Sequence, residues 1–305
     1  QEASMTKLLG FMWSSPHSLL IMATLMWAGH ANVLKVSINE ISPMLLMCFR
    51  WIGCFIMLTF FLWPDMIKYI PSVKKRLPWV GIMGGIGMAG FTICLIVAAH
   101  STSAINLGIA QSFIPALVMI LGLVILGTTI SKVQATGLIL SMIGALILVS
   151  KGSMESIIGF TVNFGDLIML VGCFCYAGYT LGLGNRIEMP PTVMFLFFSF
   201  FASLSLFICI IFEFLAGNLI WPGTKGIVII LYCIVFPSVL AQTFFIRGVE
   251  LIGANRAGLY VNLVPIFTAL MAIIFLAESL FVFHIISLLL VLSGIFVAEN
   301  FKNTH

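Results

Sequence analysis

Ten apolar runs of about 20 residues follow one another along this chain of 305 residues. An α-helix rises ~1.5 Å per residue, so about 20 residues are enough to cross the ~30 Å hydrocarbon core of a bilayer. Only 8% of the residues are charged, against about 25% in soluble domains, and nearly all of them fall between the runs. The sequence therefore predicts an all-α integral membrane protein without a sizeable soluble domain. The predicted spans are residues 17–37, 43–63, 78–98, 104–127, 132–150, 165–184, 191–215, 226–246, 256–276 and 281–299.

The distribution of Lys and Arg predicts the orientation of the chain. Short gaps rich in Pro, Gly, Ser and Asn make neighbouring helices antiparallel. If the N-terminus is cytoplasmic, ten Lys and Arg residues fall on that side and three on the other, so the positive-inside rule places both termini in the cytoplasm. The largest basic group, Lys74-Lys75-Arg76 with Lys68, lies in a gap between two runs. We interpret it as a signal for orientation in the membrane and expect no nucleic-acid partner. The inner set is Lys7, Lys68, Lys74, Lys75, Arg76, Lys132, Arg186, Arg247, Arg256 and Lys302, and the outer set is Lys35, Lys151 and Lys225.

The segment from Arg247 to Asn300 has a counterpart 150 residues earlier in the chain. When residues 98–150 are aligned with residues 248–300 without a gap, small residues and a proline coincide. Such residues carry backbone constraints that a match between two leucines does not. The coinciding pairs are Ala104 with Ala254, Gly108 with Gly258, Pro115 with Pro265, and Gly144 with Gly294.

The alignment predicts two related halves, residues 5–152 and 160–302, with five spans each. An odd number of spans makes the second copy enter the bilayer from the opposite face, which gives an inverted repeat. Inverted repeats are typical of alternating-access transporters, in which two halves expose one central site to either side in turn. They also occur in some channels, so a passive pore for small solutes stays open as the alternative.

Several motifs follow one another along the chain: Phe49-Arg50-Trp51, Gly165-Asp166-Leu167, Gly253-Ala254-Asn255-Arg256-Ala257, Pro265, Ala277-Glu278 and Gly294. In this order and spacing they resemble the EamA-type members of the drug/metabolite transporter superfamily. The resemblance covers essentially the whole chain and implies ten helices in two inverted five-helix halves. It also implies movement of small metabolites, often outward from the bacterial cytoplasm. One difference is that the family often has Gly-Glu after the fourth and ninth spans, where this chain has Gly127-Thr128 and Ala277-Glu278.

Arg50 is the most informative single residue, because it is a charged side chain inside a span. Such a charge costs about 2.5–3.5 kcal/mol on insertion scales and is expected to face protein or water. His30 lies at a similar depth, about 10 Å from the outer end of the neighbouring antiparallel span. The two side chains are candidates for one cavity, where Arg50 attracts a carboxylate or phosphate. The alternative is that helix carbonyls satisfy Arg50 and that it only locks the fold.

The other candidate binding residues are aromatic side chains and amides within the spans. Trp27 with His30 in the first span matches Tyr176 with Tyr179 in the sixth, since each pair is spaced i, i+3 on one helix face. Tyr260 is a further candidate for an apolar or cation-binding wall. Gln111 and Asn262 are candidates for hydrogen bonds to a solute. The alternative for each aromatic residue is core packing, and for each amide a hydrogen bond to a neighbouring helix.

Residues near the ends and the middle of the spans have expected structural roles. Asp166 and Glu278 stand ahead of the sixth and tenth spans, where a carboxylate complements a helix N-terminus. Pro115 and Pro265 each remove one backbone hydrogen bond and are expected to kink their helices. Charged residues at span ends are expected to anchor the chain and to form ion pairs.

Catalytic and metal-binding motifs are not found in the sequence. The five histidines are scattered, and the seven cysteines lie in or beside apolar runs without a CxxC pair. We expect no enzyme activity, no cofactor and no metal. The sequence thus predicts a secondary transporter of small polar or amphipathic metabolites, amino-acid-like solutes above all, acting as an exporter or exchanger. The expected location is the bacterial inner membrane, and the expected partners are the solute and the lipid bilayer.

Overall fold

The computed structural model describes residues 13–158, 163–217, 219–276 and 279–300. Every regular element within these segments is helical, which confirms the all-α prediction. Ten helical segments in this part of the chain are long and apolar enough to cross a membrane, as predicted. They are Pro16–Ser37, Pro43–Lys75, Leu77–Ala99, Ile105–Leu126, Lys132–Val149, Phe164–Asn185, Pro191–Leu215, Thr224–Ile252, Ala254–Phe275 and Val282–Glu299.

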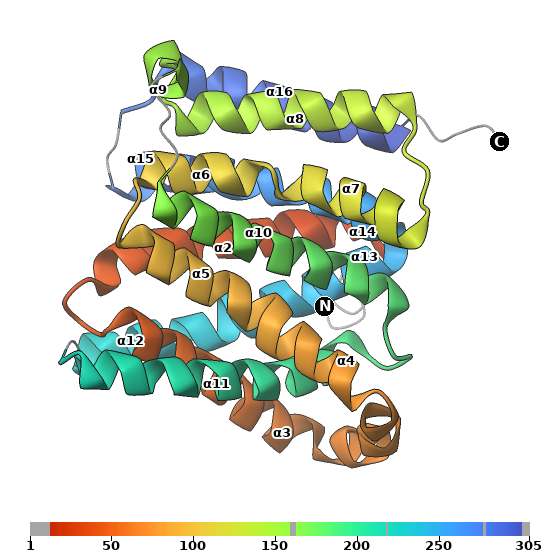
Figure 1. Cartoon of the computed structure of the whole chain (residues 1–305), viewed down its shortest axis with the longest axis vertical. Coiled ribbons are helices and arrows are strands. Elements are labelled where there is room, and N and C mark those ends of the chain that lie inside the picture. Colours follow the sequence, from red (N-terminus) through yellow and green to blue (C-terminus); the bar gives the residue numbers. More distant parts are fainter. Residues whose placement is uncertain (1–12, 159–162, 218, 277–278, 301–305) are drawn as a thin grey trace, which may run out of the picture.

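The individual helices lie side by side in stacked rows (Figure 1). α8 and α16 form one outer row, and α3, α11 and α12 lie at the opposite side. The helices are α2 (Pro16–Ser37), α3 (Pro43–Lys75), α4 (Leu77–Gly81), η1 (Ile82–Met88), α5 (Ala89–Ala99), α6 (Ala104–Ser112), α7 (Ile114–Leu126), α8 (Lys132–Val149), α9 (Met154–Ile158), α10 (Phe164–Gly182), η2 (Leu183–Asn185), α11 (Pro191–Leu215), α12 (Thr224–Ile234), η3 (Val235–Leu240), α13 (Ala241–Ile252), α14 (Ala254–Leu259), η4 (Tyr260–Asn262), α15 (Leu263–Leu276) and α16 (Val282–Asn300).

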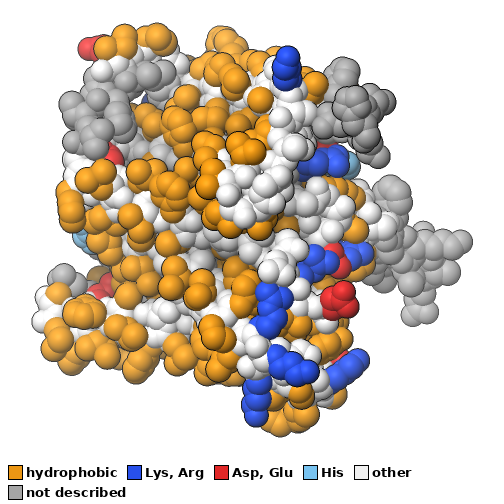
Figure 2. Space-filling view, turned by 45° about the vertical axis from the view of Figure 1, so that its right-hand side comes forward, with side chains coloured by type: hydrophobic (Ala, Val, Ile, Leu, Met, Phe, Trp, Pro, Cys, Tyr) orange, Lys and Arg blue, Asp and Glu red, His pale blue; other side chains and the backbone are white. Residues whose placement is uncertain are grey.

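The two ends of the helix bundle differ in charge. Lys and Arg side chains gather toward one end, while the sides of the bundle are largely hydrophobic (Figure 2). We call this the basic end. Arg186 and Arg247 both pair with Glu250 there, at 2.9 and 2.7 Å, and Arg256 pairs with Glu299. These contacts confirm the expected ion pairs at the span ends.

α3 is longer than the sequence predicted. The predicted second span ends at residue 63, before the Pro64-Asp65 pair, but the helix continues to Lys75. Near the predicted end of the span, α3 has a kink, because Leu62 has non-helical φ and ψ angles of −115° and 23°. Pro64 lies just after this kink, in the first turn of the helical segment that follows. Proline lacks a backbone N–H, but in a first turn that N–H would have no partner within the helix, so its absence costs little. The extension carries Lys68, Lys74 and Lys75 and forms part of the basic end.

Besides α3, four of the described spans are interrupted, and these form two pairs. The third and the eighth each contain a π-helical segment, η1 and η3. The fourth breaks at Phe113, between α6 and α7, and Pro115 lies in the first turn of α7. The ninth passes through the 3-10 turn η4 just ahead of Pro265. The breaks in the fourth and ninth spans lie beside Pro115 and Pro265, where irregular helices were expected.

α8 and α16 cross in direct backbone contact. A Cβ atom built on Gly137 would lie 2.5 Å from the Gly294 carbonyl oxygen, and one built on Gly144 would lie 2.8 Å from the Ser287 oxygen. The contacts run in opposite directions along the two helices, so the helices are antiparallel. Small residues at such crossings let helices associate in lipid. This crossing joins the last span of the first half to the last span of the second.

The first span of each half packs on the other half. α2 packs on α13 and α15, and α10 packs on α5 and α7.

At the end opposite the basic end, Asp166 forms a reciprocal capping box with Asn163 and accepts hydrogen bonds from Thr102 (2.5 Å) and from Asn106 (3.1 and 3.0 Å). The expectation that Asp166 caps the sixth span is therefore confirmed. Glu278 lies outside the described residues.

Candidate functional site

Arg50 is buried inside the bundle, with 5% of its surface exposed. Its Nε donates a 2.5 Å hydrogen bond to the Ser238 hydroxyl, and one terminal nitrogen lies 2.7 Å from His30 Nε2. The guanidinium also lies over the Trp51 ring, 4.4 Å from its centroid. Among the described residues, no Asp or Glu forms a salt bridge with Arg50. The cation is hydrogen-bonded but lacks a counter-ion in this part of the chain.

The contact with Arg50 fixes the role of the His30 ring. A guanidinium has only donors, so His30 Nε2 must accept the hydrogen bond. The ring then carries its proton on Nδ1, which lies 3.7 Å from the Cys233 sulfur. Both polar neighbours of Arg50 are therefore neutral groups that leave its positive charge uncompensated.

The Arg50 cluster, which we define as Arg50, His30, Ser238 and Cys233, lies at the contact of the two halves. His30 and Arg50 come from α2 and α3, while Cys233 and Ser238 come from α12 and η3. The Ser238 hydroxyl also donates a 2.6 Å hydrogen bond to the Cys233 carbonyl, five residues earlier. This bond to the residue five positions back follows the π-helical spacing of η3. The irregular segment of the eighth span thus presents a polar group to the first half.

An aromatic cluster adjoins the Arg50 cluster. Trp27 donates from its indole nitrogen to the Pro237 carbonyl at 3.0 Å, and its ring packs on Tyr176 and Phe245 at centroid distances of 6.2 and 5.2 Å. Tyr176 also contacts Phe91 at 5.2 Å and Tyr179 at 5.9 Å. We call these five rings the aromatic cluster.

Two chain segments connect the clusters. Trp27 and His30 stand one turn apart on α2, and Pro237 and Ser238 are consecutive in η3. The polar and aromatic groups are therefore neighbours along both segments. Together they can hold the charged head and the apolar or cationic part of one small solute.

Three predicted site residues lie elsewhere and have partners there. Gln111 donates to the Leu107 carbonyl of its own helix at 3.3 Å. Asn262 donates to Ser141 of α8 at 3.0 Å and is buried. Tyr260 shares a 2.5 Å hydrogen bond with His17, which lies 13 residues before His30 on α2, about 20 Å along the helix axis. Of these three contacts, that of Asn262 is the hydrogen bond to a neighbouring helix given as the alternative in the sequence analysis.

Sequence reasoning missed several residues at the site. Gln242 accepts a 3.4 Å hydrogen bond from the Tyr179 hydroxyl, and Phe91 and Phe245 complete the aromatic cluster. Gln242 carried a usable signal, since it is an amide within a predicted span, as Gln111 is. Ser238 carried none, because a serine in an apolar run is common and its helix is irregular.

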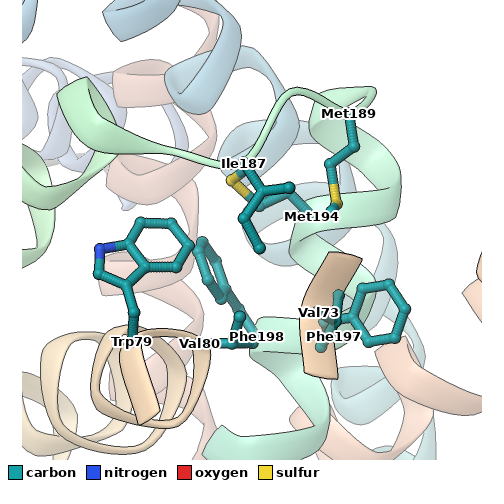
Figure 3. Close-up of a pocket in the computed structure, with 8 residues that line it drawn as sticks. All are labelled: Val73, Trp79, Val80, Ile187, Met189, Met194, Phe197 and Phe198. Atoms are coloured by element: carbon teal, nitrogen blue, oxygen red, sulfur yellow. The ribbon is translucent and has the colours of Figure 1, made fainter. Parts of the chain in front are cut away.

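A separate hollow lies near the start of α4 (Figure 3). It is a shallow depression with no interior space for a water molecule, and Figure 3 shows Trp79 and Phe198 facing Ile187 and Met194 across it. Phe198 also packs against Tyr179 at 6.0 Å. The side chains that line the hollow carry no charge, and the Trp79 indole is the one with a hydrogen-bonding group, so the hollow offers little to a polar solute. They are Val73, Trp79, Val80, Ile187, Met189, Met194, Phe197 and Phe198.

The ten apolar helices and the buried polar cluster between the halves define a polytopic α-helical membrane protein with a polar centre. Its sequence matches the EamA-like transporter family twice, over residues 14–150 and 163–299. The chain belongs to this family, which identifies it as a transporter and confirms the predicted resemblance. The two matches fall one in each half of the chain.

The sequence is similar over most of its length to proteins from a bacterium and an archaeon. It is 28% identical over 274 residues to the "Uncharacterized transporter YyaM" of Bacillus subtilis, which covers 88% of each chain. It is 27% identical over 290 residues to an "Uncharacterized transporter" of Archaeoglobus fulgidus, covering 93% of this chain and 97% of the other. A solved crystal structure is similar in fold, with a TM-score of 0.76 at 15% identity over 94% of this chain and 96% of that one.

Proposed function

We propose that the chain is a secondary transporter that moves small carboxylate-bearing metabolites, amino-acid-like solutes above all, by alternating access, as an exporter or exchanger. The observation that carries the proposal is the buried Arg50 cation, whose partners in the described residues are neutral. A charge inside a membrane span is costly and is kept where a function needs it. A solute carboxylate between the halves supplies the missing negative charge through charge-assisted hydrogen bonds.

Alternating access requires two halves that move against each other around the site. The antiparallel crossing of α8 and α16 supports an inverted arrangement of the two halves, residues 5–152 and 160–302. The paired interruptions in the third and eighth spans and in the fourth and ninth spans supply symmetric bending points. The Arg50 cluster takes groups from both halves, so their relative motion changes the solute's surroundings.

The proposed orientation places the basic end in the cytoplasm, and with it both termini. Lys68, Lys74 and Lys75 of the α3 extension lie at this end, as do the ion pairs of Arg186 and Arg247 with Glu250. The positive-inside rule is the reason for the assignment. We propose the inner membrane of a bacterium as the location.

A counterflow assay tests this function. Purified protein in liposomes preloaded with unlabelled L-leucine or L-phenylalanine should accumulate the same labelled amino acid transiently, with saturable kinetics. Arg50→Gln should abolish the accumulation. Uptake that rises linearly with concentration and shows no counterflow would instead favour a passive pore.

A further inference from the structure

The Tyr176 hydroxyl is a buried polar group at the site, and the proposed function leaves it unexplained. Tyr176 is 8% exposed and its ring packs among four others at centroid distances of 5.2 to 6.2 Å. Its hydroxyl oxygen is shielded and has no hydrogen-bond partner among the described residues. The Tyr179 hydroxyl one turn away does have a partner, Gln242. A buried phenol normally finds a partner, so this orphan hydroxyl marks a place where one is missing.

The surroundings of Tyr176 restrict what the missing partner is. Four rings pack against the Tyr176 ring, those of Trp27, Phe91, Tyr179 and Phe245, and the faces of aromatic rings attract cations. A phenol oxygen accepts hydrogen bonds as well as donating them. An ammonium group uses both properties, because it donates to the oxygen and is stabilised by the ring faces.

The charge of such an ammonium group has to be balanced inside the membrane. Among the described residues, no carboxylate is paired with the Arg50 cluster, and Arg50 itself is positive. A solute that brings its own carboxylate solves this, since the carboxylate faces Arg50 and the ammonium faces the rings. The clusters adjoin through Trp27 and His30, one turn apart on α2.

We infer that Tyr176 receives the ammonium group of a zwitterionic solute whose carboxylate is held by Arg50, an inference that rests on the proposed function. Arg50 then selects for the anionic group and Tyr176 selects for the cationic one. Tyr176 is thus a specificity-determining residue of the site, and deaminated analogues of a solute bind less well than the solute itself.

Three matched pairs of probes test this inference. Each pair differs only in the amino group: L-leucine and isocaproate, L-phenylalanine and hydrocinnamate, δ-aminovalerate and valerate. Binding to the purified protein is measured by titration calorimetry. For at least one pair, the wild type should bind the amino member more tightly. Tyr176→Phe should weaken that member by roughly ten- to a hundred-fold, the effect of one charge-assisted hydrogen bond, and leave its deaminated partner within about twofold.

Tyr69→Phe serves as the matched control, because it removes a phenol hydroxyl from the α3 extension, outside both clusters. Its binding should equal that of the wild type. Apo melting temperature shows whether Tyr176→Phe folds, and it should not fall, since the change removes an unpartnered buried hydroxyl.

Two results would overturn the inference while the proposed function stands. One is equal weakening of both members of a pair by Tyr176→Phe, and the other is unchanged binding of both. In either case Arg50→Gln still weakens all the carboxylates. Failure of every probe to bind the wild type would overturn the proposed function, and this inference with it.

Discussion

Replacing Arg50 by Gln separates an anion-binding role from a structural one. The change removes the positive charge but keeps a polar side chain with a donor. Two charge-assisted hydrogen bonds are affected, to Ser238 and to His30, and each contributes about 1.5–3 kcal/mol to stability. The substitution also removes a destabilising contribution, because the variant no longer buries an uncompensated cation. That burial costs about 2.5–3.5 kcal/mol on insertion scales. The two effects overlap in size, and the Gln side chain keeps a donor, so we expect the melting temperature of the apo protein to change little.

The effect on binding is expected to be much larger than the effect on folding. A solute carboxylate loses a charge-assisted hydrogen bond worth about 1.5–3 kcal/mol, which weakens Kd by roughly ten- to a hundred-fold. The assay measures the melting temperature of the apo protein and titrates two ligands by calorimetry: L-leucine, and its uncharged analogue N-acetyl-L-leucinamide. Only the carboxylate should lose affinity.

Arg186→Gln is the matched control, because Arg186 is paired with Glu250 at the basic end. It should leave the affinity for carboxylates unchanged. A fall in the apo melting temperature of Arg50→Gln, with equal losses for charged and neutral ligands, would refute the anion-binding role and leave Arg50 as a lock on the fold.

Three further predictions concern the fold and its orientation. A cysteine at Lys75 should stay unlabelled by an impermeant reagent added outside the cell, while one at Met154 should react; the reverse would overturn the topology. Gly137→Ala should lower the melting temperature, because its Cβ would lie 2.5 Å from a backbone oxygen of α16, whereas Gly178→Ala meets no atom within 4 Å and should not. Asp166→Ala should destabilise the protein by about 1–3 kcal/mol in a denaturant titration, through loss of its cap and its bonds to the first half, and an unchanged midpoint would contradict this role.

Run length and residue type predicted most of the fold. The ten spans follow from hydrocarbon thickness, and only α3 departs strongly, because its extension past Pro64 is too polar to read as membrane helix. Equal depth on neighbouring antiparallel helices put His30 and Arg50 together as candidates, and the structure brings them to 2.7 Å.

The remaining contacts depend on three-dimensional detail that a sequence pattern does not carry. Ser238 reaches Arg50 from a π-helical segment, where the regular spacing of 3.6 residues no longer tells which side chains share a face. Asn262 bonds to Ser141 of another helix, and the same amide in the same span would suit a solute equally well. Only the packing of the neighbouring helix decides between these uses.

Distances across the two ends of the bundle test the central claim, which is that the halves move to expose one site to either side. Spin labels on Leu126 and Leu251 span the basic end, and labels on His100 and Phe275 span the opposite end; all four side chains are exposed. Electron–electron double resonance is recorded with and without L-leucine, or with whichever carboxylate probe binds. Alternating access predicts that one distance shortens while the other lengthens. Lengthening of both distances together would contradict it and favour a pore.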